Sequence, residues 1–441
     1  MPEQPLDVEA VRRCADGAWA WVLEQVRYEP DGAWVPLTVP VSGDVPSTPP
    51  PDRDCLYDGV AGLAPVLAEI RLAREWTTAE QALADAVVAR LSEAGNDDDC
   101  SLYVGLAGRL AAVALLDPGA TDPLLDRLAD RARPDGWPTP VFGAPSTPVN
   151  DLVLGNAGIV LTCAWLGGSR ADRLTEVGAE AALAAATPAA GGLSWSMYAG
   201  DRPRVMPNYS HGTAGVATAL AVAGWRLGRP DLVEAARRGA EHIVGMADMT
   251  GDGFRLPLQV PPVGGDTEPY AYGWCHGPTG TARMFGALQL AGVSEFAGRS
   301  CGEWVERAAR SVRSSGLPAR LRPGFWDNNG RCCGTAGVLD ATLDLAQAGD
   351  PSAMEFADLV VGALLDRAEP SPQHPRHCYW RFREHRSDPP DLDPGVGWMQ
   401  GAAGIAAALH RYVRVREHGR SAARVGLPDD WWSGPLTPVP A

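Results

Sequence analysis

The chain has 441 residues, 45% of them hydrophobic, and its 54 acidic and 38 basic side chains give a net charge of -16. This negative excess argues against general binding to phosphate backbones, so we expect no nucleic-acid partner. The chain contains no run of about 20 apolar residues, so we expect no transmembrane span either.

The first 55 residues are predicted to form an N-terminal helix followed by a proline-rich segment. The opening residues lack a basic stretch followed by an apolar one, so we predict no secretory signal and a cytoplasmic location. Nine cysteines, an odd number at scattered positions, favour free thiols or metal ligands over a disulfide framework in such a reducing compartment.

Seven copies of one short unit follow along the chain. Each unit has an apolar or aromatic approach, then Gly-x-x-Gly, then a run of small apolar residues. The units are LYDGVAGLA (56–64), LYVGLAGRL (102–110), VLGNAGIVL (153–161), SHGTAGVAT (210–218), WCHGPTGTA (274–282), CCGTAGVLD (332–340) and WMQGAAGIA (398–406). Their first glycines are 46, 50, 57, 65, 57 and 67 residues apart, which leaves room for two helices in each interval.

The segment after each Gly-x-x-Gly is apolar on most sides and is predicted to be a buried inner helix. Amphipathic stretches between the units, such as 79–91, 302–313 and 354–368, are predicted to be outer helices. Such repetition makes either an open solenoid or a closed ring, and a ring would bring the chemistry-bearing units together.

We therefore predict an all-α fold, an α/α toroid with seven inner and seven outer helices. The toroid is expected to span residues 56–425, followed by a C-terminal tail at 426–441. The last residues of this tail, SGPLTPVPA, are predicted to be poorly ordered. Connectors rich in proline and glycine are predicted to be loops at one end of the ring.

Three cysteines share a local setting that the other six lack. Cys275 and Cys332 each stand two positions before the first glycine of consecutive units, and Cys333 follows directly. This phasing predicts that the thiols meet at the starts of adjacent inner helices, where the helix dipole would lower a thiol's pKa.

Three clustered thiolates repel one another unless a cation holds them. Zn²⁺ is the expected ion, because it takes cysteine sulfur in tetrahedral geometry, and three protein ligands leave the fourth position open as in catalytic sites. Two alternatives stay open at this point: His276 as a fourth ligand, and buried cysteines without any metal.

At these residues the sequence resembles the lanthionine synthetase C family, the LanC-like cyclases. The resemblance runs through all seven units and is most specific in YSHGTAG (209–215), GWCHGPTG (273–280) and CCGTAG (332–337). It implies an α/α toroid with a zinc ion held by Cys275, Cys332 and Cys333, in a three-cysteine variant of the family's site. It also matches His211 and Asp151 to the family's histidine and aspartate.

The resemblance implies a reaction and a substrate. A cysteine thiol of a dehydrated precursor peptide would add to dehydroalanine or dehydrobutyrine, forming lanthionine or methyllanthionine. A separate dehydratase would supply that peptide. The addition leaves an enolate that needs a proton, for which His211 is the first candidate and His276 the second, with Asp151 orienting His211.

Three other functions are alternatives to the cyclase. The same zinc chemistry would serve an enzyme that adds a small thiol such as glutathione to dehydroamino acids in proteins. A zinc-containing scaffold would bind a peptide without turnover. An α/α-toroid glycosidase ranks last because it needs two facing carboxylates, which the glycine-headed positions do not carry.

Overall fold

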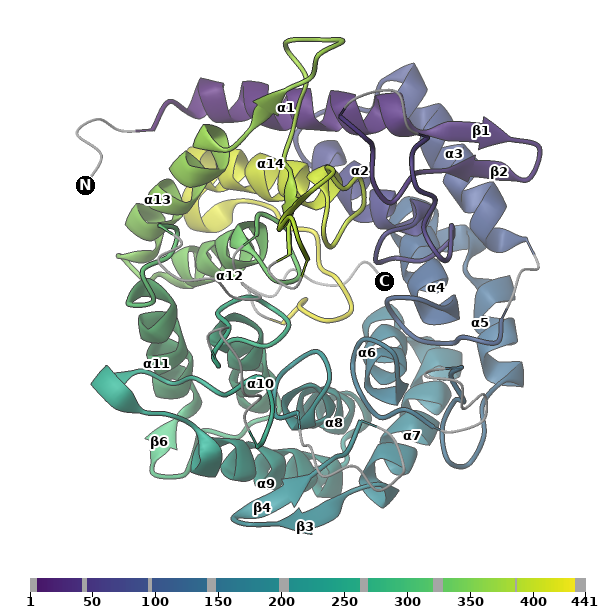
Figure 1. The fold of residues 1–441 in the computed structure, drawn as a ribbon. Helices are drawn as coiled ribbons and strands as arrows, with labels where there is room; N and C mark the ends of the chain where they lie inside the picture. Colours follow the sequence, from purple (N-terminus) through teal and green to yellow (C-terminus); the bar gives the residue numbers. More distant parts are fainter. Residues whose placement is uncertain are drawn as a thin grey trace.

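The computed structural model describes residues 6–41, 46–93, 97–140, 148–197, 206–261, 269–319, 328–384 and 387–432. Within these ranges the chain forms fourteen α-helices arranged as two concentric rings (Figure 1). The inner helices are α2 (Leu63–Arg71), α4 (Leu106–Leu116), α6 (Asn156–Leu166), α8 (Thr213–Leu227), α10 (Pro278–Leu290), α12 (Thr335–Ala348) and α14 (Ala402–His418). The outer helices are α1 (Val8–Gln25), α3 (Thr78–Ser92), α5 (Asp122–Asp130), α7 (Gly168–Ala184), α9 (Pro230–Met246), α11 (Cys301–Arg313) and α13 (Ala353–Asp366). The predicted α/α toroid is confirmed.

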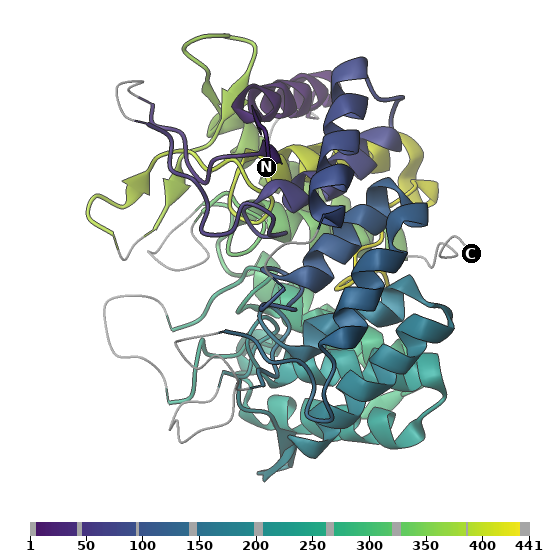
Figure 2. The ribbon, with the colours of Figure 1, turned by 90° about the vertical axis from the view of Figure 1, so that its right-hand side faces the viewer.

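Short hairpins connect the helices. The strands form five two-stranded antiparallel sheets in the described part of the chain: β1 (Arg27–Glu29) with β2 (Gly32–Trp34), β3 (Thr187–Ala189) with β4 (Gly192–Ser194), β5 (Glu295–Phe296) with β6 (Arg299–Ser300), β7 (Glu369–Pro370) with β8 (Cys378–Tyr379), and β9 (Phe382–Arg383) with β10 (Asp391–Leu392). Many of the connecting loops gather at one end of the ring (Figure 2). No helix among the described residues is both long and apolar enough to cross a bilayer.

A closed ring of backbone hydrogen bonds joins the seven glycine units. In each unit, the residue two positions before the first glycine donates its N–H to the carbonyl of the same position in the next unit. The bonds, 2.9 to 3.2 Å long, run from Tyr57 to Tyr103, Val153, Ser210, Cys275, Cys332, Met399 and back to Tyr57. The last unit thus bonds to the first, so the solenoid is closed and every unit is held at the same height in the ring.

The second glycine of each unit makes this close approach possible. A Cβ at Gly280 would lie 1.9 Å from the carbonyl oxygen of Trp274 and 3.0 Å from Cβ of Tyr209 in the neighbouring unit. A Cβ at Gly62 would lie 2.8 Å from Cβ of Trp398, across the point where the ring closes. These contacts are too short for any side chain, so the repeated glycine follows from backbone packing.

The N-terminal helix α1 belongs to the outer layer and packs against α14. Its apolar face is buried, and the indole N–H of Trp19 donates to Glu80 of α3 at 2.8 Å. Residues 426–432 also pack against the ring. The division of the chain at residues 55 and 425 stays a prediction, and the predicted disorder of 433–441 lies outside the described residues.

Residues 419–432, which follow α14, run to the central part of the ring (Figure 1). The Asp429 carboxylate accepts hydrogen bonds from the hydroxyl of Tyr103 and the indole of Trp274, each at 3.1 Å, and its carbonyl accepts one from Tyr209 at 2.6 Å. These three aromatic residues come from three different units. The C-terminal segment therefore joins repeats that are distant in the sequence.

Asp430, the next residue, is the counter-ion of three buried arginines. Its carboxylate lies 3.0 Å from Arg424, 3.4 Å from Arg283 and 3.6 Å from Arg331. Burial alone would raise the pKa of Asp430, but these positive charges outweigh it and the pKa is lowered.

We expect Asp430→Ala to lower the free energy of unfolding by about 3–5 kcal/mol, because it leaves buried guanidinium groups without a full partner. Urea denaturation measures this. The exposed pair Arg229–Asp231 supplies a control, since Asp231→Ala removes an ion pair in solvent and should change the midpoint little.

Candidate metal centre

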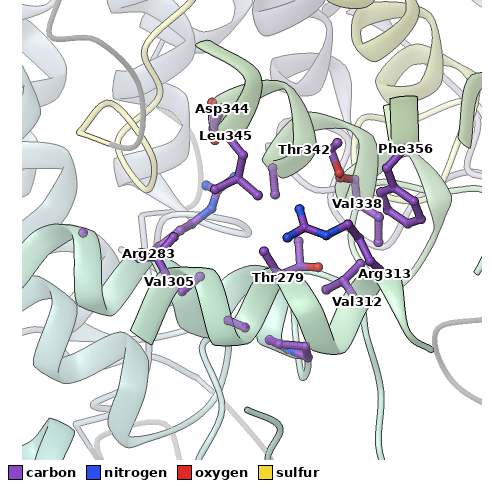
Figure 3. A pocket seen from close by; sticks show the side chains of 16 residues that line it. Thr279, Arg283, Val305, Val312, Arg313, Val338, Thr342, Asp344, Leu345 and Phe356 are labelled. Atoms are coloured by element: carbon purple, nitrogen blue, oxygen red, sulfur yellow. The ribbon is translucent and has the colours of Figure 1, made fainter. Parts of the chain in front are cut away.

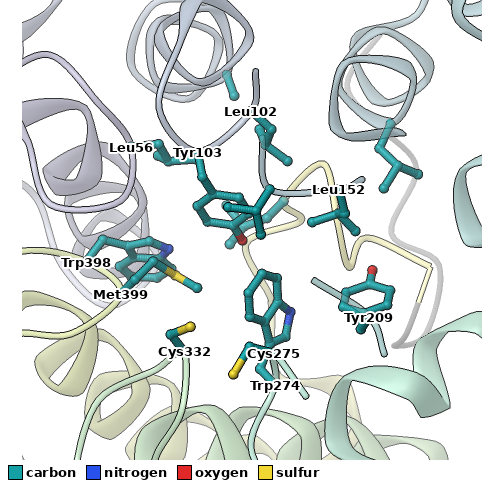
Figure 4. Packing of buried hydrophobic residues seen from close by; sticks show 14 of the residues in the cluster. Leu56, Leu102, Tyr103, Leu152, Tyr209, Trp274, Cys275, Cys332, Trp398 and Met399 are labelled. Atoms are coloured by element: carbon teal, nitrogen blue, oxygen red, sulfur yellow. The ribbon is translucent and has the colours of Figure 1, made fainter. Parts of the chain in front are cut away.

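The backbone ring places Cys275 and Cys332 next to each other. The N–H of Cys275 donates to the carbonyl of Cys332 at 3.1 Å, and both thiols lie at the edge of the central cluster of buried side chains (Figure 4). The sulfur of Cys333 lies 3.3 Å from that of Cys275 and 3.4 Å from that of Cys332. All three sulfurs lie within 4.8 Å of one another, as their common phase in the repeat predicted.

The three thiols fit a zinc ion. Bonds of about 2.3 Å in tetrahedral geometry place ligand sulfurs roughly 3.8 Å apart, so these sulfurs need to spread by only a few tenths of an ångström. The described residues contain no other group of three cysteine, histidine or carboxylate donors within such reach, and no histidine joins the cysteine group. The candidate ligand set among the described residues is therefore three sulfurs, without His276.

The thiol pKa values differ from the sequence-based expectation. Hydrogen bonding with Cys332 and Cys333, together with burial, raises the pKa of Cys275 well above its usual range. For Cys332 the hydrogen bond with Cys275 acts in the opposite direction, but bonding to Cys333 and burial outweigh it and raise the pKa. Hydrogen bonding with Cys275 and Cys332 lowers the pKa of Cys333. Mutual hydrogen bonding thus favours the thiolate at Cys333 and, together with burial, opposes ionisation of Cys275 and Cys332. A nearby cation would favour ionisation of all three thiols.

Two residues that the sequence analysis missed contact the thiols. The side-chain amide of Gln400 donates to the hydroxyl of Tyr57 at 2.9 Å and to the sulfur of Cys333 at 3.6 Å. Tyr57 in turn is hydrogen-bonded to Cys332. Both residues occupy motif positions: Tyr57 shares the position of Cys275, and Gln400 shares that of Cys333, directly before the first glycine. Aligning the units by phase would have identified both.

His211 and Asp151 form a pair beside the thiols. Nδ1 of His211 lies 2.7 Å from one carboxylate oxygen of Asp151, and the other oxygen accepts the N–H of Leu154 at 2.6 Å. Asp151 is fully buried, whereas His211 is a quarter exposed and lines the same pocket as the cysteines. The carboxylate thus fixes the ring of His211 and leaves Nε2 as its second proton-carrying atom.

His276 lies in the same pocket. Its ring centroid is 5.7 Å from that of His211, and its positive charge when protonated favours the thiolate of Cys333. The structure therefore gathers all six residues singled out by the sequence at one place: the three cysteines, Asp151, His211 and His276.

The pocket over the thiols has a volume of about 230 Å³. Part of its wall comes from Phe382 and Glu384, in the connection between α13 and α14. These two residues lie outside every glycine unit, and no pattern in the sequence marks them. They reach the pocket because the tertiary structure folds the connection between α13 and α14 over it.

A second cavity lies elsewhere, between α10, α11 and α12 (Figure 3). It measures about 90 Å³, its wall is largely apolar, and no cysteine or histidine lines it. Its two buried charges already have partners: Arg283 contacts Asp429 and Asp430, and Asp344 accepts a hydrogen bond from Arg411 at 2.6 Å. This cavity is a packing gap rather than a reaction site.

The chain is similar to a known protein family in sequence and to known structures in fold. The family model described as "Lanthionine synthetase C-like protein" matches residues 50–418. Among solved structures, nisin cyclase matches with a TM-score of 0.57 and 15% identity, over 82% of this chain and 88% of that one. A type II terpene cyclase from Scytonema, solved with geranylgeranyl dihydroxybenzoate, has a TM-score of 0.40 and 13% identity, over 92% and 98% of the two chains. No curated protein sequence matches.

Proposed function

Because its family model spans most of the chain, the protein belongs to the lanthionine synthetase C-like family, and we propose on this premise that it is a zinc-dependent lanthipeptide cyclase. The reaction adds a cysteine thiol of a dehydrated precursor peptide to dehydroalanine or dehydrobutyrine in the same peptide. The products are the thioethers lanthionine and methyllanthionine. The observation that carries the proposal is the meeting of three thiols with the His211–Asp151 pair in one pocket.

Cys275, Cys332 and Cys333 would hold the zinc ion. When bound, zinc supplies an open position at which a substrate thiol loses its proton. Three thiolates and one Zn²⁺ give the centre a formal charge of -1, two positive charges minus three negative ones. This charge favours a loosely held, nucleophilic sulfur. Gln400 and Tyr57 donate hydrogen bonds into the thiol cluster and offset part of its charge.

His211 is the proposed acid–base residue. Addition of sulfur to the double bond leaves an enolate, and the α carbon must then receive a proton. Nε2 of His211 can deliver it, while the buried Asp151 carboxylate at Nδ1 fixes the ring orientation. His276 lines the same pocket and is the second candidate.

The test of this function is incubation of the purified protein with a dehydrated precursor peptide. Cyclisation consumes free peptide thiols at unchanged mass, because the addition is internal. Addition of glutathione instead would raise the mass of the acceptor, which would support thiol transfer rather than ring formation. If the zinc-loaded protein left the cysteine thiols of every dehydrated precursor peptide unreacted, the cyclase function would be wrong and only a peptide-binding role would remain.

Gln400→Leu tests the hydrogen bonds to the ligand sulfurs. Leucine keeps a similar volume but cannot donate, so zinc affinity should fall by about 10- to 100-fold, the usual effect of losing a residue that orients a metal ligand. Competition with a chromophoric chelator measures the affinity. Gln289→Leu, at an exposed position near the end of α10, is the matched control. Equal affinities for the two variants would contradict the role of Gln400.

A further inference from the structure

Two cysteines outside the proposed zinc site lie in contact. The sulfur of Cys14 on α1 is 3.6 Å from that of Cys378 on β8, although 364 positions separate the two residues in the chain. The Cys378 thiol also lies 3.4 Å from the carbonyl oxygen of Cys14. Neither residue belongs to a glycine unit, and neither has a role in the proposed reaction.

The packing around this pair keeps the two sulfurs in register. Gly17, one turn further along α1, lets the helix approach closely, since a Cβ there would lie 2.4 Å from the carbonyl oxygen of Arg376. The next turns continue this contact: the rings of Trp21 and Tyr379 lie 5.3 Å apart, and Glu24 accepts a hydrogen bond from His377 at 2.9 Å. Positions 14, 17, 21 and 24 form one face of a helix, so the whole face holds the β7–β8 hairpin.

The two thiols are partly exposed to solvent, and their pKa values differ. Both are partly exposed, whereas Cys163 and Cys301 are buried. The hydrogen bond from Cys378 lowers the pKa of Cys14, and the same bond raises that of Cys378. Cys14 is therefore the better nucleophile, and Cys378 is placed to attack it once Cys14 has reacted.

We propose that Cys14 and Cys378 form a reversible disulfide by exchange with a small-molecule disulfide such as glutathione disulfide. The Cys14 thiolate attacks one sulfur of glutathione disulfide, forms a mixed disulfide and releases one glutathione. Cys378 gives up its proton and attacks the sulfur of Cys14, which forms the protein disulfide and releases the second glutathione. Overall two protein thiols lose two electrons and two protons, and one glutathione disulfide is reduced to two glutathione molecules.

This bond would link the outer helix α1 to the wall of the thiol pocket. Strand β8 ends at Tyr379, and the chain continues into β9, where Phe382 borders the pocket, and then to Glu384. The sulfurs need to approach by only about 1.5 Å to reach a disulfide bond length of about 2.05 Å. Oxidation would therefore fasten the start of the chain to the connection that borders the site.

Peptide mapping of the zinc-loaded wild-type protein tests the proposal. The protein is equilibrated in glutathione buffers of increasing oxidation, free thiols are alkylated, and the protein is digested with trypsin. We expect the peptides CADGAWAWVLEQVR (14–27) and HCYWR (377–381) to appear joined, two hydrogens lighter than their sum, and to separate with dithiothreitol. The melting temperature of the oxidised form should rise by roughly 5 °C, because the bond restricts the unfolded chain.

Single variants give the matched comparison. In Cys378→Ser the resolving thiol is missing, so glutathione should remain attached to Cys14, whereas Cys301→Ser should form the joined peptides like the wild type. Two results would overturn the proposal: both peptides alkylated and unlinked under oxidising conditions, or a lasting glutathione adduct on Cys14 in the wild type. The mapping does not depend on turnover, so it stands apart from the test of the cyclase reaction.

Discussion

Cys275→Ala is expected to lose zinc and, with it, the cyclisation reaction. Losing a residue that merely orients a ligand costs about 10- to 100-fold in metal affinity, so losing one of three ligands should cost more than 100-fold. Two sulfurs from Cys332 and Cys333 would remain, and no further cysteine, histidine or carboxylate joins them among the described residues. Metal analysis after gel filtration measures zinc per chain, and loss of free peptide thiols measures turnover.

The matched control is Cys301→Ala, which removes a buried thiol of α11 that contacts the carbonyl oxygen of Val293 and does not belong to the cluster. It should retain one zinc per chain. Circular dichroism of both variants separates loss of metal from loss of fold. If Cys275→Ala kept a full complement of zinc, the three-sulfur site would be wrong.

His211→Ala should lower the rate of cyclisation by about 10²- to 10⁴-fold while zinc binding is unchanged, because positioned proton transfer contributes that much. His211 is outside the sulfur cluster, so the metal site keeps all of its ligands. Single-turnover assays with a dehydrated peptide measure the rate, and zinc content is determined on the same preparation.

Two further substitutions sharpen this prediction. Asp151→Asn should cost less than His211→Ala, because the imidazole stays and only the hydrogen bond that orients it is weakened. His242→Ala, on the outer helix α9, removes a histidine that contacts the carbonyl oxygen of Ala190 and should leave the rate unchanged. A smaller loss for His211→Ala than for His276→Ala would assign proton delivery to His276 instead.

Much of the fold could be predicted because the same packing requirement recurs in each of the seven units. Seven glycine pairs recur with a constant spacing inside each unit, and the backbone packing explains why: a Cβ at each second glycine would overlap a carbonyl oxygen of the preceding turn. The same phase predicts that Cys275 and Cys332 occupy adjacent positions in the ring. His211 and His276 share the phase of Cys333, directly before the first glycine.

Other features depend on contacts between segments that carry no repeated signal. Asp429 and Asp430 lie in a stretch that resembles an ordinary tail, yet they bind aromatic residues and arginines from several units at the centre of the ring. Phe382 reaches the pocket, and Cys378 reaches Cys14, only through the path of one connection. The thiol pKa values also depend on the tertiary structure, since mutual hydrogen bonding raises the pKa of Cys275 and lowers that of Cys333 at distances that no spacing in the sequence specifies.

The amino-acid sequence by itself determined the repeat, its alternation of inner and outer helices, and the candidate residues, because these follow from local periodicity and from the position of each residue within a unit. Closure of the ring, the central C-terminal segment, the hydrogen bonds of Tyr57 and Gln400 to the thiols and the contact between Cys14 and Cys378 were decided by the tertiary structure. The reason is physical: each joins groups separated by tens to hundreds of residues, and their meeting depends on the summed geometry of all the units between them.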